Sequence, residues 1–215
     1  MRLNKMHFPV TTLGYGHRIG IWTQGCSIRC PGCISRDTWE SESSSEIQIG
    51  ALLLAIGPWL GLADGITISG GEPFDQPEAL AALLKLLRGG FAGDILVYSG
   101  FPHERLFARH SETIKLVDVL ITEPFDSSAG QTLTLRGSDN QRIFLLTDLA
   151  LARYPANFNR QLWGDERRLD VAVTGNEVWM AGIPRIGDMT RFRKQLARRG
   201  FSGHSSDQPQ PSIRA

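Results

Sequence analysis

HRIGIWTQGCSIRCPGCI, residues 17–34, decides the fold class of this chain of 215 residues. Its first eight residues are largely apolar and β-branched and are followed by Gly25, which predicts a strand that runs directly into a loop. Cys26, Cys30 and Cys33 lie in that loop, and the sequence contains no other cysteine. Three cysteines within eight residues cannot build a disulfide framework, so the sequence assigns them to a site at a strand end.

Downstream of this loop, short apolar runs alternate with helical periodicities. We expect strands at residues 65–69, 94–99 and 117–122. We expect helices at residues 43–57, 77–88 and 103–109. This alternation predicts an α/β fold in which a parallel sheet collects ligands at the carboxyl ends of its strands. The expected form is a partial (β/α) barrel, an open curved parallel sheet with helices outside.

The C-terminal part of the chain is less regular. Residues 169–183 predict a small hairpin with a turn at Gly175 and Asn176, and residues 187–199 predict a basic helix. Arg191, Lys194 and Arg198 share one face of that helix. We favour the interpretation that this face is solvated over the interpretation that it docks an acidic partner. The expected organisation is a core at residues 1–147, an extension packed on it at 148–203, and a disordered tail at 204–215.

Composition and charge exclude several classes of protein. Hydrophobic residues make up 41% and charged residues 21%, which is typical of a globular domain and not of a disordered chain. The net charge of +1 offers no overall basic surface, so we expect no nucleic-acid partner. No apolar run approaches the length that crosses a bilayer, and no signal peptide is recognised, so we expect a cytoplasmic protein without a membrane partner.

The cysteine spacing favours an iron-sulfur cluster. Three thiolates in one turn can bind three irons of a 4Fe-4S cluster and leave the fourth iron open, where S-adenosylmethionine can chelate it. One alternative is a zinc site with a histidine as fourth ligand, of which His17 is the nearest but lies beyond a predicted strand. Two further alternatives remain open. One is an electron-carrying cluster, which would ordinarily need a fourth cysteine. The other is that the three cysteines have no shared role.

Glycines near the cysteines fit the same chemistry. Gly25 and Gly32 allow close backbone approach to a cluster. The run Ser-Gly-Gly-Glu-Pro at residues 69–73 ends a strand and exposes carbonyls that can accept from an ammonium group, while Glu72 can hold the loop or the cation. Taken alone, this run is also compatible with an ordinary turn.

Five motifs in this order resemble the radical S-adenosylmethionine superfamily, and within it the glycyl-radical activating enzymes of the anaerobic ribonucleotide reductase type. They are CSIRCPGC at 26–33, ITISGGEPF at 66–74, VYSGF at 97–101, VDVLITEPF at 117–125 and RGSDNQRI at 136–143. The resemblance implies that Cys26, Cys30 and Cys33 bind the cluster. It further implies S-adenosyl-L-methionine contacts by Gly32, Cys33, Ile34, Gly70, Gly71, Glu72 and Ser99.

The resemblance also implies a reaction. The expected enzyme cleaves S-adenosylmethionine reductively to a 5'-deoxyadenosyl radical and generates a glycyl radical on a partner enzyme, with electrons from a reduced flavodoxin or ferredoxin. The extra C-terminal residues leave open a radical enzyme that modifies another protein, a peptide or a small molecule. An interpretation of another class, a non-catalytic metal-binding interaction module, also remains.

Overall fold

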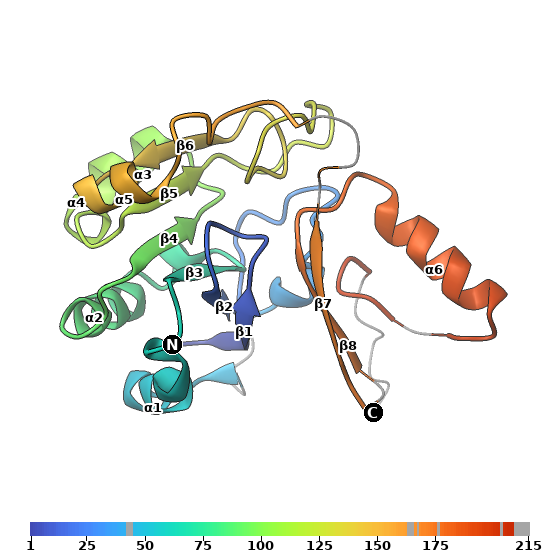
Figure 1. Ribbon diagram of the computed structural model, residues 1–215, viewed down its shortest axis with the longest axis horizontal. Helices are drawn as coiled ribbons and strands as arrows, with labels where there is room; N and C mark the ends of the chain where they lie inside the picture. Colours follow the sequence, from blue (N-terminus) through green and yellow to red (C-terminus); the bar gives the residue numbers. More distant parts are fainter. Residues whose placement is uncertain (42–44, 163–165, 167, 176, 203, 209–215) are drawn as a thin grey trace.

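The computed structural model describes residues 1–41, 45–162, 166, 168–175, 177–202 and 204–208. Its centre is a six-stranded sheet whose spatial order follows the sequence (Figure 1). The strands are β1 (Leu3–Val10), β2 (Arg18–Thr23), β3 (Gly65–Gly70), β4 (Asp94–Tyr98), β5 (Val119–Thr122) and β6 (Arg142–Leu145). Neighbours from β2 to β5 are parallel, whereas β1 and β6 are antiparallel edge strands. The fold is therefore a mixed α/β structure with a parallel-rich sheet.

The sheet is open in the part of the chain that the structure describes, because no pairing joins β1 to β6. No closed barrel forms. The expectation of an entirely parallel sheet is wrong at both edges, since β1 and β6 run against their neighbours. Strand β1 carries mostly half-buried side chains and lacks the alternation that marks a strand in sequence.

Helices connect the parallel strands and cover one face of the sheet. They are α1 (Ile49–Leu60), α2 (Pro77–Arg88), α3 (His103–Arg109) and α4 (Ser111–Ile114), while α5 (Asp148–Arg153) follows β6. Leu80, Leu83, Leu84 and Leu87 of α2 are buried in the main core, as their spacing predicts. The first helix begins at Ile49 and not at the expected capping box, of which residues 43 and 44 lie outside the described residues.

A buried ion pair aligns the amino ends of the parallel strands. Arg18 of β2 and Asp94 of β4 are both almost fully buried, with Nη2 and Oδ2 2.8 Å apart. Arg18 also donates to the Thr67 hydroxyl at 2.7 Å and to the Ile66 carbonyl at 2.8 Å, both on β3. The guanidinium therefore ties three neighbouring strands together at the end of the sheet opposite the cysteine loop.

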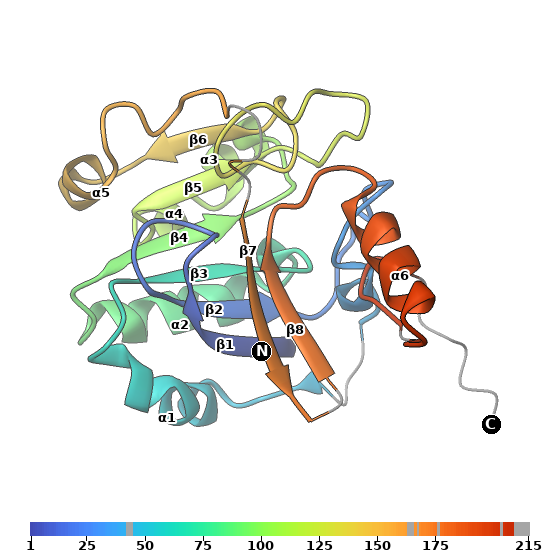
Figure 2. The same ribbon diagram turned by 45° about the vertical axis from the view of Figure 1, so that its right-hand side comes forward.

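The C-terminal extension packs against the first strands of the sheet (Figure 2). Beyond α5, the extension contains the hairpin β7 (Leu169–Thr174) and β8 (Glu177–Gly182) and the helix α6 (Asp188–Arg198), as predicted. The Asp170 carboxylate accepts four hydrogen bonds of 2.6–3.1 Å from the backbone and hydroxyl groups of Thr11 and Thr12. Trp179 stacks on His7 with ring centroids 3.6 Å apart. One face of the hairpin is thereby fixed to the core.

Residues 204–208, expected to begin a disordered tail, contact the cysteine loop. The Ser206 hydroxyl donates to the Ile34 carbonyl at 3.0 Å, and the Ser206 carbonyl accepts from the Asp37 amide at 3.2 Å. Asp207 forms an ion pair with Arg193 of α6 at 2.6 Å. The rest of the expected tail, residues 209–215, lies outside the described residues. Among the described helices, none has the length and apolar character that a membrane span requires.

Candidate functional site

The loops that follow β2, β3 and β4 meet at one end of the sheet, around a cavity of about 420 Å³. Parallel strands place their carboxyl ends at the same edge, which is why these loops converge. The cavity is lined by every site residue that the sequence analysis named, from three separate segments of the chain. They are Cys26, Cys30, Gly32, Cys33, Ile34, Gly70, Gly71, Glu72 and Ser99.

The cysteine loop is fixed at both ends by backbone hydrogen bonds. The Gly25 amide donates to the Thr38 carbonyl at 2.8 Å, and the Cys26 amide donates to the Trp39 carbonyl at 3.1 Å. Within the loop, the Cys33 amide donates to the Cys30 carbonyl at 3.1 Å. Gly32, at φ +80°, supplies the left-handed residue between those cysteines that the tight turn requires.

The Gly-Gly-Glu loop lies directly against the start of the cysteine loop. The Gly71 amide donates to the Thr23 carbonyl at 2.9 Å, and the Glu72 amide donates to the Gly25 carbonyl at 2.9 Å. These bonds continue the parallel pairing of β2 and β3 beyond the ends of the strands. The backbone preceding Cys26 is therefore held by the loop after β3.

Glu72 is fully buried and joins the loop after β3 to the end of β4. Its carboxylate accepts hydrogen bonds of 2.8 Å from the Ser99 hydroxyl and 2.8 Å from the Gly100 amide, and one of 3.0 Å from the Phe74 amide. Burial raises the pKa of Glu72 to about 7, against the opposing effect of these three donors. Glu72 and Ser99 bind each other, so both act on the cavity by holding its loops in place.

The three thiols occupy similar environments. Burial raises the pKa of Cys26, Cys30 and Cys33. The Ser35 amide donates to the Cys33 sulfur at 3.4 Å. The indole N–H of Trp39 also lowers the Cys33 pKa, although the indole nitrogen is buried and forms no hydrogen bond of ordinary geometry. A buried donor without a full partner beside a thiol fits a site that receives an acceptor such as a cluster sulfide.

The spacing of the sulfurs also bears on the choice of metal. Across the described ranges, the three cysteine sulfurs do not all lie within 4.8 Å of one another. A single zinc ion with ligand distances of about 2.3 Å would bring its sulfurs to within about 4 Å. His17, the histidine considered as a fourth ligand, does not line the cavity. The donor set therefore fits a larger, cuboidal group better than one metal ion.

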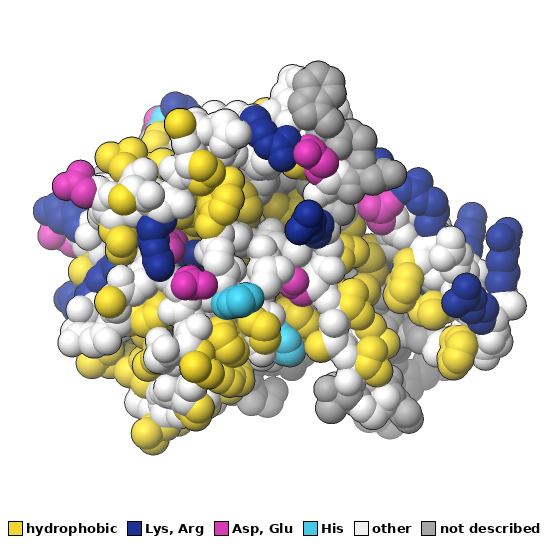
Figure 3. Space-filling view, viewed as in Figure 1, with side chains coloured by type: hydrophobic (Ala, Val, Ile, Leu, Met, Phe, Trp, Pro, Cys, Tyr) yellow, Lys and Arg dark blue, Asp and Glu magenta, His cyan; other side chains and the backbone are white. Residues whose placement is uncertain are grey.

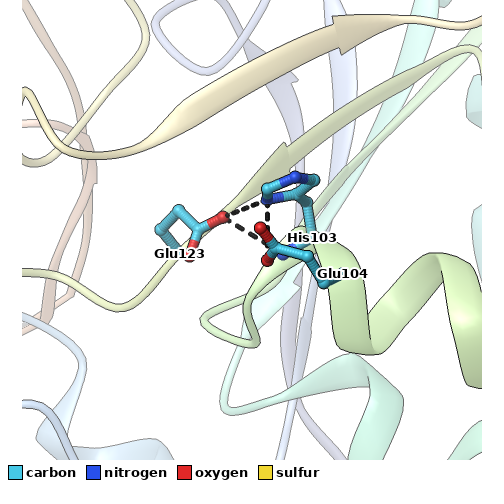
Figure 4. Close-up of side chains that lie close together, drawn as sticks. All are labelled: His103, Glu104 and Glu123. Atoms are coloured by element: carbon cyan, nitrogen blue, oxygen red, sulfur yellow. Dashed lines mark hydrogen bonds and ion pairs between the residues drawn. The ribbon is translucent and has the colours of Figure 1, made fainter.

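Among the residues that the structure describes, one cluster has three potential ligand atoms within 4.8 Å of one another, from His103, Glu104 and Glu123 (Figure 4). It lies outside the cavity, and Arg142 already supplies a cation there, with Nη1 2.8 Å from Nε2 of His103. Glu123 accepts from the His103 amide at 3.1 Å and so caps α3, whose own N-cap residue, Pro102, has no side-chain hydrogen bond. The cluster therefore has a structural role. Because its carboxylate caps α3, Glu123 is retained at a position whose φ of +79° would otherwise favour glycine.

The cavity also contains residues that the sequence analysis did not assign to it. From the core these include Lys5, Trp22, Tyr98 and Gln141, and from the extension Met180, Ile183, Ile186 and Met189. Lys5 forms an ion pair with Asp37 at 2.9 Å, and Gln141 donates to the Glu123 carbonyl at 3.0 Å. Tyr98 and Gln141 had a signal, because they lie in the VYSGF and RGSDNQRI motifs, and Trp22 lies on the strand predicted before the cysteine loop. Lys5 and the residues of the extension lie on segments whose position against the sheet no local pattern reveals.

A comparison with protein families gives a match over residues 12–144 to the model described as a 4Fe-4S single cluster domain. The chain belongs to the 4Fe-4S single cluster domain family. This match covers the strands, the cysteine loop and the Gly-Gly-Glu loop, and it confirms the predicted iron-sulfur class. It ends before the extension that forms the remaining wall of the cavity.

Curated relatives agree with this family. The anaerobic ribonucleoside-triphosphate reductase-activating proteins of Enterobacteria phage T4 and Escherichia coli K12 are each 29% identical, over 63% of this chain and 88% and 93% of their own lengths. A pyruvate formate-lyase-activating enzyme of Staphylococcus aureus is 30% identical over 71% of this chain and 62% of its length. The prediction of a radical S-adenosylmethionine enzyme of the activating type is confirmed. A solved structure of QueE from Escherichia coli, with 26% identity over 47% of this chain and 53% of that one, has a TM-score of 0.39, too low to inform the fold.

Proposed function

We propose that this 4Fe-4S family member cleaves S-adenosylmethionine reductively and generates a glycyl radical on a partner enzyme of the anaerobic ribonucleotide reductase type. In this reaction one electron breaks a carbon–sulfur bond of S-adenosylmethionine to give methionine and a 5'-deoxyadenosyl radical, which takes a hydrogen atom from the partner. The observation that carries the proposal is the convergence of three cysteines and a Gly-Gly-Glu loop on one cavity.

In this proposal Cys26, Cys30 and Cys33 hold the cluster, which when bound supplies the electron and an open iron for S-adenosylmethionine. The side of the cavity for S-adenosylmethionine is formed by Gly32, Cys33, Ile34, Gly70, Gly71, Glu72 and Ser99. A volume of about 420 Å³ is within the range of cofactor pockets. Glu72 and Ser99 position the loops, and the aromatic side chains of Trp22 and Tyr98 restrict the access of water.

The proposal extends to the fold and to the partners. We take the open sheet as an incomplete (β/α) barrel whose gap admits a segment of another protein, with residues 1–147 as the core and 148–203 as an extension. The electron donor is a reduced flavodoxin or ferredoxin, and neither nucleic acid nor membrane takes part. The cytoplasm is the proposed compartment. The names of the relatives support a protein partner, because they activate a ribonucleotide reductase or a formate-lyase.

A second candidate is a radical enzyme that modifies a different protein or peptide. The reductase-activating relatives are matched over about nine-tenths of their length, yet the match leaves more than a third of this chain uncovered. The hairpin and α6 lie outside the family match at residues 12–144 and contribute to the lining of the cavity. A cavity wall outside the family match favours a substrate that differs from that of those relatives.

Metal analysis and activity together test the proposal. Protein purified without oxygen is expected to hold about four irons and four sulfides and to release 5'-deoxyadenosine from S-adenosylmethionine with dithionite. Cys26→Ala, Cys30→Ala and Cys33→Ala should each abolish both properties, because two thiolates cannot hold the cluster. Ser27→Ala, in the same loop without a sulfur, is the control. One zinc per chain without iron, or a cysteine variant with full activity, would contradict the proposal.

A further inference from the structure

The hairpin of the extension presents an apolar face to solvent. In the register of β7 and β8, Val171 pairs with Met180 and Val173 with Val178, so these side chains share one face with Leu169. Val171, Val173 and Val178 are 58%, 69% and 48% exposed. The opposite face carries Asp170 and Trp179, which fix the hairpin to the core. The apolar face, defined by Leu169, Val171, Val173, Val178 and Met180, is therefore a fixed and uncovered surface.

This face continues into the cavity. Leu169 and Met180 lie at the end of the hairpin nearest the cysteine loop and line the cavity, whereas the three valines extend away from it. Ile186, 56% exposed, lies on the rim between the hairpin and α6. Among the described residues, four of the twelve exposed large hydrophobic side chains belong to the hairpin, so exposed apolar surface is concentrated there.

A basic helix borders the apolar face. Lys194 and Arg198 are exposed on α6, and neither forms an ion pair with any residue that the structure describes, whereas Arg191 pairs with Asp188. The half-buried Phe192, Arg193 and Leu196 lie between these cations in sequence, on another face of the helix. Figure 3 shows dark-blue side chains along α6 beside yellow side chains over the hairpin, on one face of the molecule.

We infer that the extension is the docking surface for the protein substrate, and that it binds an extended segment of the glycyl-radical partner that carries apolar side chains followed by acidic ones. The apolar side chains lie on the three valines, the acidic ones face Lys194 and Arg198, and the segment continues past Leu169 and Met180 into the cavity. Continuity of the apolar face with the cavity, and the charge of the exposed Lys194 and Arg198 on the neighbouring helix α6, argue for this occupant. The inference rests on the proposed function.

Two sets of variants test this surface with the complete, cluster-loaded protein. The triple variant Val171→Thr, Val173→Thr and Val178→Thr keeps β-branched side chains and removes the apolar surface. The double variant Lys194→Glu and Arg198→Glu reverses the charge of the helix. The matched controls are Leu54→Gln on α1, and Lys85→Glu with Arg109→Glu on α2 and α3, which are all exposed and do not line the cavity.

The probe is a glycyl-radical enzyme of the anaerobic ribonucleotide reductase type from the same source. Dithionite-driven cleavage of S-adenosylmethionine without this partner should be unchanged in all variants. The threonine variant should raise the partner concentration for half-maximal glycyl radical, measured by electron paramagnetic resonance, by about tenfold. The glutamate variant should bind the partner more weakly and with a smaller dependence on salt. The control variants should match the wild type.

The outcomes separate the two proposals. Glycyl radical formed equally well by the wild type and by both test variants would overturn the docking surface and leave the proposed function intact. Absence of a glycyl radical with the wild type, while S-adenosylmethionine is still cleaved, would overturn the proposed partner and with it this assignment of the surface. Loss of partner-free cleavage in folded, cluster-loaded variants would show that the extension acts on the chemistry and does not dock the partner.

Discussion

Gly71 and the carbonyl of Gly25 meet so closely that a Cβ atom at position 71 would lie 2.1 Å from the Gly25 oxygen. The absence of a side chain at Gly71 thus serves the contact between two loops. Gly25 immediately precedes Cys26, so any displacement here moves the first of the three proposed cluster ligands. A displacement of the Gly-Gly-Glu loop therefore also displaces the start of the cysteine loop.

Gly71→Ala is therefore expected to lower iron content and S-adenosylmethionine cleavage together, because the Cβ displaces the backbone before Cys26. Iron and sulfide per chain, measured after anaerobic reconstitution, check this. Gly57→Ala in α1, where a Cβ meets no atom within 4 Å, should have no such effect. Full iron content with reduced binding of S-adenosylmethionine would instead indicate that Gly71 touches only the cofactor.

Glu72 should make stability depend on pH in a definite direction. Burial raises its pKa from 4.5 to about 7, so between these values the folded protein keeps a proton that the unfolded chain releases. The stabilisation of the folded protein by the proton on Glu72 is complete below pH 4.5 and is lost as the pH rises through 7. The free energy of unfolding should fall in that window by on the order of 2 kcal/mol more in the wild type than in Glu72→Gln.

Urea titrations across this pH range, on proteins of equal iron content, measure the difference. The exposed Glu78→Gln should follow the wild type. Parallel curves for the wild type and Glu72→Gln would show that Glu72 has no raised pKa in the folded protein.

Trp39 should influence the reduction potential of the cluster. Its buried indole N–H faces the environment of the Cys33 sulfur, and a donor near sulfur stabilises the more negative, reduced state. Trp39→Phe removes the donor and keeps the aromatic ring, so the midpoint potential should become more negative. A redox titration followed by electron paramagnetic resonance measures this, with Trp59→Phe on α1 as control. Equal potentials for the wild type and Trp39→Phe would contradict the role.

Asp170 should hold the extension against the core. Asp170→Ala removes the acceptor of four hydrogen bonds from Thr11 and Thr12 and should free the hairpin. Limited proteolysis should then cut the extension faster, while iron content stays near the wild-type value and S-adenosylmethionine binds more weakly. Asp170→Asn, which keeps one carbonyl oxygen, should lie between the two. Unchanged proteolysis of the alanine variant would show that Trp179 and its neighbours are sufficient to hold the hairpin against the core.

The sequence predicted those parts of the fold and site that local patterns specify. The apolar runs of β2, β3, β4 and β5 and the periodicity of α2 are visible in the chain, and so are the cysteines that follow β2. Strand β1 escaped prediction because its side chains are half-buried through tertiary contacts, which leave no alternation in the sequence. The role of Met180 in the cavity also escaped, because it depends on where the hairpin lies against the core.

The hydrogen bond between Ser206 and the Ile34 carbonyl joins residues 172 positions apart and has a consequence for the order of folding. During synthesis the cysteine loop leaves the ribosome long before residue 206 exists, so the loop must remain without this partner until residue 206 has been synthesised. Contacts of such long sequence separation form late, because loop closure opposes them until the intervening chain is ordered. The nascent chain therefore exposes its three thiols first and gains the bond beside them only after the intervening residues have been made.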